Sequence, residues 1–295
     1  MRLETALLTG LSLGSIYALV ALGFVILHKS SSVLNFAHGS FVVMGAYVTA
    51  RTYPVFGFYG AAIAGIAAAA VTALVVERLF IRPIRNAPVI SLAIMTIGIE
   101  VLLNTELTRQ MGVQILSLGQ PWEAARIALG PVTISVNRVL AIAVAVAVIG
   151  GFLLVFRFSS WGVSMRAAAE DRETAELVGL KLGKITMVSW TVAGALAGIA
   201  GIFLTGAPTP GLSPALAAIA LRAFPAAIIG GLDSVAGALV GGLIVGMVEA
   251  FAAVYQDELL FLGRGIGDVL PFIVMILVLV FRPQGLFGGK ESARV

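Results

Sequence analysis

Very few side chains in this sequence are placed to do chemistry, and the first candidate is a serine near the start. Ser12 lies in Gly10-Leu11-Ser12-Leu13-Gly14, which matches the G-x-S-x-G nucleophile elbow of many hydrolases. That chemistry needs a tight strand-to-helix turn and a histidine base, and the chain offers only His28 and His38. Because the pentapeptide lies within an apolar run of helix length, we expect its small residues to pack helices together. An intramembrane hydrolase using Ser12 is the alternative.

A second group of polar residues interrupts the apolar sequence after the first hydrophobic run. Asn35 and His38 lie in Leu34-Asn35-Phe36-Ala37-His38-Gly39, just after three serines at 30–32. Polar backbone at membrane depth is tolerated only where protein or a water-filled cavity covers it. The segment predicts either a broken helix or re-entrant turn that lines a transport pathway, or an interfacial loop with a buried, hydrogen-bonded His38.

Two further polar residues, Glu100 and Asn104, lie one helical turn apart in an apolar run and therefore share a helix face. A carboxylate at the centre of a membrane helix costs about 2.5–3.5 kcal/mol on insertion scales, so such residues usually face the interior of a bundle. The pair is a candidate for contact with a transported solute. A structural ion pair or interhelical hydrogen bond is the other interpretation.

The sequence carries no recognisable nucleotide, metal or cofactor site. Gly183-Lys184 is followed by Ile185 and Gly289-Lys290 by Glu291, so neither matches the P-loop signature. Cysteine is absent, and two histidines cannot form a His-rich metal site. We therefore expect no catalytic, cofactor or metal residues here, and any ATP and magnesium would be bound by a separate ATPase subunit.

The densest charge lies in one stretch, residues 157–184, which holds nine charged residues between apolar runs. Small and apolar residues at helical spacing, including Ala175, predict a helix with a narrow face that enters a groove on a partner protein. Glu170 and Asp171 flank that face, Arg166 is spaced to pair with Glu170, and Gly179 would end the helix. The alternative is a solvated amphipathic loop, or one that lies on lipid headgroups.

These residues are set in a chain built for lipid. Of its 295 residues 59% are hydrophobic and 12% charged, against about 25% charged in soluble proteins. The class expected is an all-α, polytopic integral membrane protein of about 8–10 transmembrane or half-membrane helices in one domain, 1–295, with the first run retained as a span. The apolar runs lie at about 5–27, 33–50, 59–80, 90–108, 138–156, 187–206, 215–232, 235–255 and 266–282.

The basic residues predict the orientation of the chain in the membrane. Alternate loops divide Lys and Arg into two sets of 12 and 7, and the positive-inside rule puts the richer set in the cytoplasm. No basic run is interleaved with aromatics as nucleic-acid binding would require. The richer set comprises Lys29, Arg78, Arg82, Arg85, Arg157, Arg166, Arg172, Lys181, Lys184, Arg282, Lys290 and Arg294; the other comprises Arg2, Arg51, Arg109, Arg126, Arg138, Arg222 and Arg264.

Several segments together resemble a known family. They are GLSLGSIYALVALGF, LNFAHG followed by GAYV, MRAAAEDRETAELVGL, AGALAGIAG, IGGLDSVAGALVGG and FRPQGLFG. The chain is identified as a member of the permease subunits of branched-chain amino acid ABC importers, and most resembles the H-type subunit of the high-affinity leucine, isoleucine and valine system. The resemblance implies that a cytoplasmic loop at about 157–187 contains the coupling helix, which sits in a cleft of the ATPase subunit. Residues 170–175 depart from the family's Glu-Ala-Ala pattern, while Gly179 stands where its glycine is expected.

The resemblance also implies partners and a location. A second, M-type permease, two ABC ATPase subunits and an extracytoplasmic substrate-binding protein would complete the transporter, in the cytoplasmic (inner) membrane of a bacterium or archaeon. Membrane lipid would surround it, and the solute would be amino-acid-like. Sister permeases for urea or short amides share most of these segments. A proton-coupled secondary transporter using Glu100 is the rival from a different class.

Overall fold

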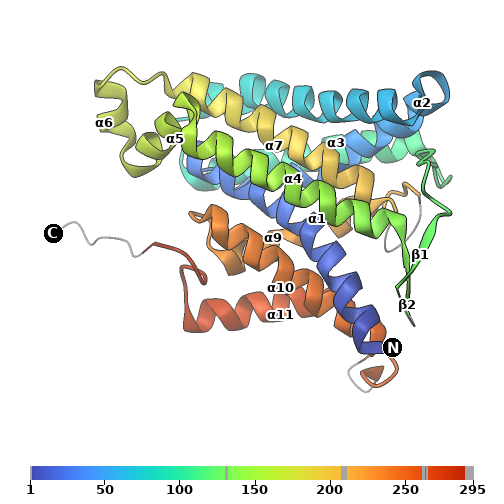
Figure 1. The fold of residues 1–295 in the computed structure, drawn as a ribbon. Helices are drawn as coiled ribbons and strands as arrows, with labels where there is room; N and C mark the ends of the chain where they lie inside the picture. Colours follow the sequence, from blue (N-terminus) through green and yellow to red (C-terminus); the bar gives the residue numbers. More distant parts are fainter. Residues whose placement is uncertain (1, 130–131, 207–210, 261–262, 264, 290–295) are drawn as a thin grey trace.

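The computed structural model describes residues 2–289 except 130–131, 207–210, 261–262 and 264. Arg264, Lys290 and Arg294, which the charge pattern assigns to loops, lie outside the described residues. Long helices lie roughly along one direction and form a bundle (Figure 1). The helices are α1 (Arg2–Ser31), α2 (His38–Val76), η1 (Glu77–Ile81), η2 (Arg82–Ile84), α3 (Val89–Met111), α4 (Val136–Phe158), α5 (Ser160–Glu170), α6 (Arg172–Leu177), α7 (Leu182–Leu204), α8 (Leu216–Leu221), α9 (Ala223–Gly230), α10 (Val235–Val254) and α11 (Ile266–Phe281).

Six helices in the described part are long and apolar enough to cross a membrane, and two shorter apolar stretches, 216–230 and 266–281, accompany them. This confirms the prediction of an all-α polytopic membrane protein. One departure is a short hairpin of β1 (Arg126–Leu129) and β2 (Val132–Ser135), in which Ile127 pairs with Ile134. Alternating apolar residues on both sides of a Gly-Pro pair favour such a hairpin, and the sequence prediction missed it.

The label α2 covers two antiparallel helical arms, which correspond to the predicted spans 33–50 and 59–80. The chain folds back at Gly57, whose φ of 65° breaks the helix just after Pro54, and two antiparallel arms result. Gly65 on the second arm lies against Gly45 and Thr49 on the first, so the arms touch where side chains are smallest. The π-helical turn η1 and the 3₁₀ turn η2 extend the second arm.

The turns between the helices gather at two ends of the bundle, which lie left and right in Figure 1. We call one the basic end; it carries α5, α6, the turn at 77–88 and the last described residues. The opposite end carries the N-terminus, the hairpin and the Gly57 turn. In the described part of the chain the helices cross the bundle nine times from one end to the other. The crossings are α1, the two arms of α2, α3, α4, α7, the α8–α9 pair, α10 and α11. The first and the last described residues accordingly lie at opposite ends of the bundle.

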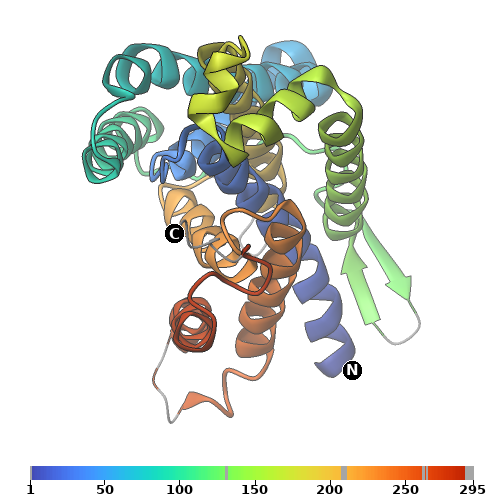
Figure 2. The same ribbon diagram turned by 90° about the vertical axis from the view of Figure 1, so that its left-hand side faces the viewer.

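The core of the bundle is α1, which is buried along most of its length between α10, α7, α4 and α9 (Figure 2). Gly10 and Gly14 lie directly against α10, where Cβ atoms would meet Met247 and Leu243. Ser12 is buried inside this continuous helix, so no strand-to-helix elbow forms and the small residues pack helices as expected. Outer helices α3 and α4 bury few of their residues, which suits a surface covered by lipid or a partner subunit.

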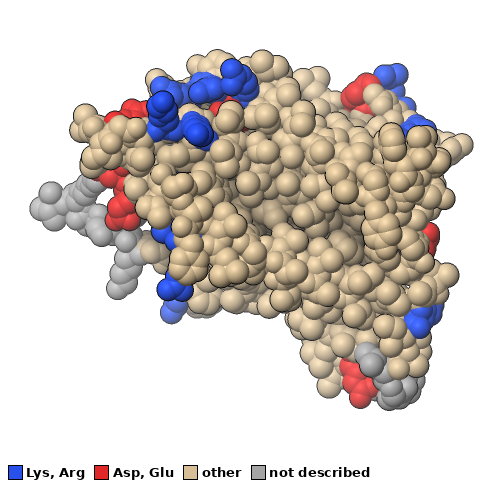
Figure 3. Space-filling model, turned by 45° about the horizontal axis from the view of Figure 1, so that its top comes forward, with Lys and Arg blue, Asp and Glu red and all other residues tan. Residues whose placement is uncertain are grey.

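The charged residues on one face of the molecule lie mainly at the two ends of the bundle (Figure 3). On the face shown in Figure 3, Lys, Arg, Asp and Glu side chains lie near the ends, and a broad uncharged band separates them. The largest gathering of Lys and Arg on this face is at the upper left, towards the basic end. An uncharged band of this kind is what the hydrocarbon core of a bilayer requires.

Candidate functional site

The first candidate site is the break between α1 and α2. Residues 32–35 are not helical, Ser32 has a positive φ, and the chain turns at 36–37 before α2 begins. Thr96 on α3 holds this segment: its hydroxyl donates to the carbonyl of Leu34 and accepts from the amide of Phe36, at 3.1 and 3.2 Å. Beyond Ser32, which is exposed, the segment is buried or half-buried by protein, as non-helical backbone inside a membrane must be.

The start of α2 lies deep in the bundle. The amide of Ser40, in the first turn, donates to Glu100 Oε2 at 3.1 Å, and Glu100 is at the middle of α3. A Cβ on Gly39 would lie 3.3 Å from the carbonyl oxygen of Ala217 on α8. Of the two structures expected for this segment, the arrangement favours the re-entrant turn, from which a helix begins midway through the bundle.

The carboxylate of Glu100 acts as a cap for α2. The first amides of a helix lack partners within the helix, and its N-terminus carries a partial positive charge. Ala37, the residue at the N-cap position, makes no side-chain cap bond, so Glu100 supplies the acceptor from another helix. The interhelical hydrogen bond considered for Glu100 is present, and it fixes α2 to α3.

The other predicted pathway residues take different positions. Asn35 Oδ1 accepts from the amide of Ala37 at 3.1 Å and shapes the turn. His38 is fully buried on the side facing α1, where its ring lies 4.7 Å from that of Phe24. Asn104 is half-buried one turn from Glu100. The structure thus brings Asn35 and Glu100 to one turn, places His38 on the other side of α2, and leaves Asn104 one turn further along α3.

A second polar cluster, buried except for Asp268, joins residues that the sequence prediction did not connect. Glu249 on α10 accepts from the Tyr17 hydroxyl at 2.7 Å and pairs with Arg222 at 2.5 Å, and Arg222 also pairs with Asp268 at 2.9 Å. Arg222 separates α8 from α9, so the cluster ties this second helix break to α1, α10 and α11. Opposite charges inside two neighbouring apolar runs, Arg222 in 215–232 and Glu249 in 235–255, were the available signal.

The charged loop at the basic end forms two helices rather than one. Helix α5 ends and α6 begins at Asp171, where φ is −150° and the side chain accepts from the amides of Glu173 and Thr174. An aspartate in this role is a typical helix N-cap. The prediction of one helix ending at Gly179 is therefore wrong in one respect: the helix is divided at Asp171, because the aspartate side chain competes for backbone amides.

Two further expectations for this loop have mixed outcomes. Gly179 ends α6 as predicted: its φ is 88°, and the amide of Leu180 reaches the carbonyl of Ala175 in a Schellman arrangement. The pairing of Arg166 with Glu170 is not made. Arg166 instead donates to the backbone carbonyls of Phe156 and Arg157, where its positive charge caps the C-terminus of α4.

The face expected to enter a partner groove is turned inward. Ala175 is only 3% exposed and packs within the chain itself, so it cannot line a docking surface. At the end of α6 the exposed apolar residues are Leu177 and Val178, at 82% and 72%. They form what we call the α6 tip, at the part of the basic end that projects beyond the long helices in Figure 1.

Sequence comparison relates this arrangement to known proteins. The sequence pattern described as "Branched-chain amino acid transport system / permease component" matches residues 6–279. The chain belongs to this permease family. The match covers every helix of this permease up to α11, including both candidate sites.

Named relatives of this permease agree with the match. LivH from Escherichia coli K12, a high-affinity branched-chain amino acid transport system permease protein, is 30% identical over 97% of this chain and 96% of its own length. BraD from Pseudomonas aeruginosa, of the same description, is 30% identical over 98% and 97%. A probable LivH from Methanocaldococcus jannaschii is 30% identical over 93% and 89%.

Among solved structures, PsaBC from Streptococcus pneumoniae in complex with Fab superimposes on this permease with a TM-score of 0.49, at 13% identity over 97% of this chain and 93% of that chain. A likeness of that size carries no functional argument. The family assignment rests on sequence, and with the apolar helices it makes the chain a multi-pass membrane permease.

Proposed function

We propose that this chain is one permease subunit of an ATP-driven importer and carries branched-chain or chemically related amino acids inward by alternating access. The observation that supports this most is the match of relatives named as branched-chain amino acid permeases along almost the whole chain. Its place would be the cytoplasmic membrane of a bacterium or archaeon, with the basic end inside.

The partners proposed are a second, M-type permease, two ABC ATPase subunits and an extracytoplasmic substrate-binding protein. Two observations support an ATPase partner. The sequence lacks a P-loop, so ATP and magnesium would be bound by other subunits. The α6 tip exposes Leu177 and Val178 at the end of the bundle with no lipid-spanning helix beside it, and exposed apolar groups in water typically mark a protein contact.

The two helix breaks supply the moving parts that alternating access requires. One break is at 32–37, where Asn35 shapes the turn and Glu100 caps α2; the other is at Arg222, between α8 and α9. Transporters commonly place solute near such discontinuous helices. We propose that Asn35, His38, Glu100 and Asn104 form or support the pathway wall, and that Glu170, Asp171, Ala175, Gly179 and Arg166 build the coupling loop that presents the α6 tip.

The experiment that tests the substrate class is competition for uptake. The complete transporter is reconstituted with internal ATP and external binding protein, and labelled leucine uptake is measured. Unlabelled isoleucine and valine should suppress it at concentrations that suppress leucine itself, while urea and acetamide should not. Suppression by urea or acetamide alone would assign the permease to the sister group for those solutes.

A further inference from the structure

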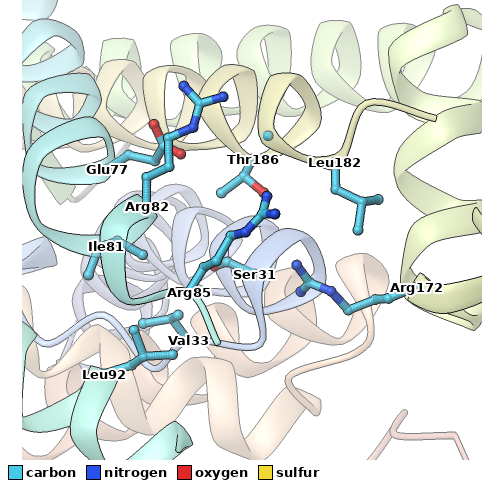
Figure 4. Close-up of a pocket in the computed structure, with 11 residues that line it drawn as sticks. Ser31, Val33, Glu77, Ile81, Arg82, Arg85, Leu92, Arg172, Leu182 and Thr186 are labelled. Atoms are coloured by element: carbon cyan, nitrogen blue, oxygen red, sulfur yellow. The ribbon is translucent and has the colours of Figure 1, made fainter. Parts of the chain in front are cut away.

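A small hollow lies at the basic end between the coupling loop and the helices beneath it (Figure 4). Arg85, from the turn before α3, and Arg172, at the start of α6, extend towards one another across it. The guanidinium of Arg82 lies directly over Gly183 on α7, and a Cβ atom at Gly183 would collide with it. We call this the basic pocket; its lining is Ser31, Val33, Glu77, Ile81, Arg82, Arg85, Leu92, Arg172, Leu182, Gly183 and Thr186.

Two more hollows adjoin the basic pocket and share Arg85 and Leu182 with it. They add three basic residues, Arg78, Lys181 and Lys184, and two acidic ones, Glu173 and Glu176. Together with Glu77, six basic groups face three carboxylates around these hollows. The local charge is therefore positive, and an anion would be attracted to it.

The central arginines are not neutralised by ion pairs. Among the described residues no salt bridge joins Arg82, Arg85 or Arg172 to a carboxylate. Burial lowers the pKa of the Arg172 guanidinium, Glu176 raises it, and the neighbouring Arg85 lowers it further. Two guanidinium groups that extend into one hollow offer several N–H donors, and a bound phosphate accepts from several N–H groups at once.

The surroundings of the basic pocket are apolar and face outward. Leu79 and Phe80 on η1, and Val89 and Ile90 at the start of α3, all have exposed side chains. These residues lie at the boundary between the apolar helices and the charged end, where the headgroup region of a bilayer would be. A phosphate in the pocket would thus have hydrocarbon-binding surface beside it.

We propose that the basic pocket binds the phosphate of an anionic phospholipid of the cytoplasmic leaflet, with its acyl chains along Leu79, Phe80, Val89 and Ile90. Basic pockets between membrane helices on the cytoplasmic side are suited to such headgroups. The lipid would bridge Arg172 of the coupling loop and Arg85 of the α2–α3 turn, and so steady the loop against the bundle. A soluble anion would use the arginines but leave the apolar side chains uncovered, which favours the lipid.

The test measures lipid retained by the purified complete transporter. Complexes are exchanged into nanodiscs that contain equal phosphatidylglycerol and phosphatidylcholine, then released and weighed by native mass spectrometry. Phosphatidylglycerol should remain bound preferentially. Arg85→Gln with Arg172→Gln should lower its retention by about thirtyfold. Arg85→Lys with Arg172→Lys should keep most of it, and the matched pair Arg51→Gln with Arg126→Gln, at the opposite end, should keep all of it.

Three results would overturn the proposal. Equal retention of the two lipids by the unmodified transporter would remove the lipid specificity without any variant being needed. Displacement of phosphatidylglycerol by millimolar inorganic phosphate would make the pocket a site for free phosphate. Retention only after the ATPase subunits are stripped would show that an acidic segment of the ATPase, rather than lipid, occupies the pocket in the assembled transporter.

Discussion

The amide of Ser40 donates to the carboxylate of Glu100 at 3.1 Å, so a side chain of α3 caps the first turn of α2. This one bond explains how a membrane helix begins in the middle of the bundle without exposing its amides to hydrocarbon. It also gives a costly carboxylate a reason to lie at that depth, because the positive end of a helix stabilises the charge. The re-entrant turn and Glu100 form one structural unit.

Loss of the Glu100 cap should weaken both folding and transport. Glu100→Leu leaves the buried amide of Ser40 without an acceptor, which costs about 1–3 kcal/mol, and should lower the melting temperature and the uptake rate together. Glu100→Gln keeps an acceptor and should be milder. Glu106→Gln, on the exposed part of α3, is the control and should leave both unchanged. Unaltered melting and uptake in Glu100→Leu would show that the cap is dispensable.

Hydrophobicity predicted nearly all of the membrane architecture because span length is set by bilayer thickness. It separated the two arms of α2, 33–50 and 59–80, but could not show that the chain folds back at Gly57, since that depends on the backbone conformation of this residue. It also could not show that the charged loop forms two helices. An aspartate can occur inside a helix, and Asp171 divides this one only because its side chain caps the first amides of α6. The pairing of Arg222 with Glu249 depends on which helices become neighbours, and spacing within each run does not contain that information.

Glycines packed against another helix should tolerate substitution by a larger residue far less than glycines with open space beside them. A Cβ at Gly246 on α10 would overlap the backbone of Gly14 on α1, whereas nothing lies within 4 Å of a Cβ at Gly150 on α4. Gly246→Val should cost about 1–3 kcal/mol by overpacking the central contact. Gly150→Val should be neutral. Comparison of detergent melting temperatures decides this, and equal melting of the two variants would contradict the packing described for α1 and α10.

The α6 tip should carry the contact with the ATPase. Leu177→Asp places a charge on an exposed position, so the permease should insert and melt normally but fail to retain its ATPase during purification. Leu177→Ile preserves an apolar tip and should retain it. Ala175→Trp should instead lower the melting temperature, because Ala175 is buried within the chain. If Leu177→Asp still purifies with the ATPase at full yield, the docking surface lies elsewhere.

The orientation of the chain can be mapped because it has no cysteine of its own. Cysteines at Arg85 and Glu173, both exposed at the basic end, should react with an impermeant reagent only in inside-out vesicles. One at Val113, fully exposed at the other end of α3, should react only from outside. Gln120 is a poor choice for this purpose because it is buried and donates to the carbonyl of Ile202. Labelling of position 173 from outside would reverse the topology.

The most direct test of the central claim is the energy source for uptake. Proteoliposomes containing the complete transporter and supplied with external binding protein are given internal ATP, or a pH gradient without ATP, and leucine accumulation is followed in each. We expect accumulation only with ATP and only when Leu177 is apolar. Accumulation driven by the pH gradient alone, and abolished by Glu100→Gln, would contradict the account and identify a proton-coupled transporter.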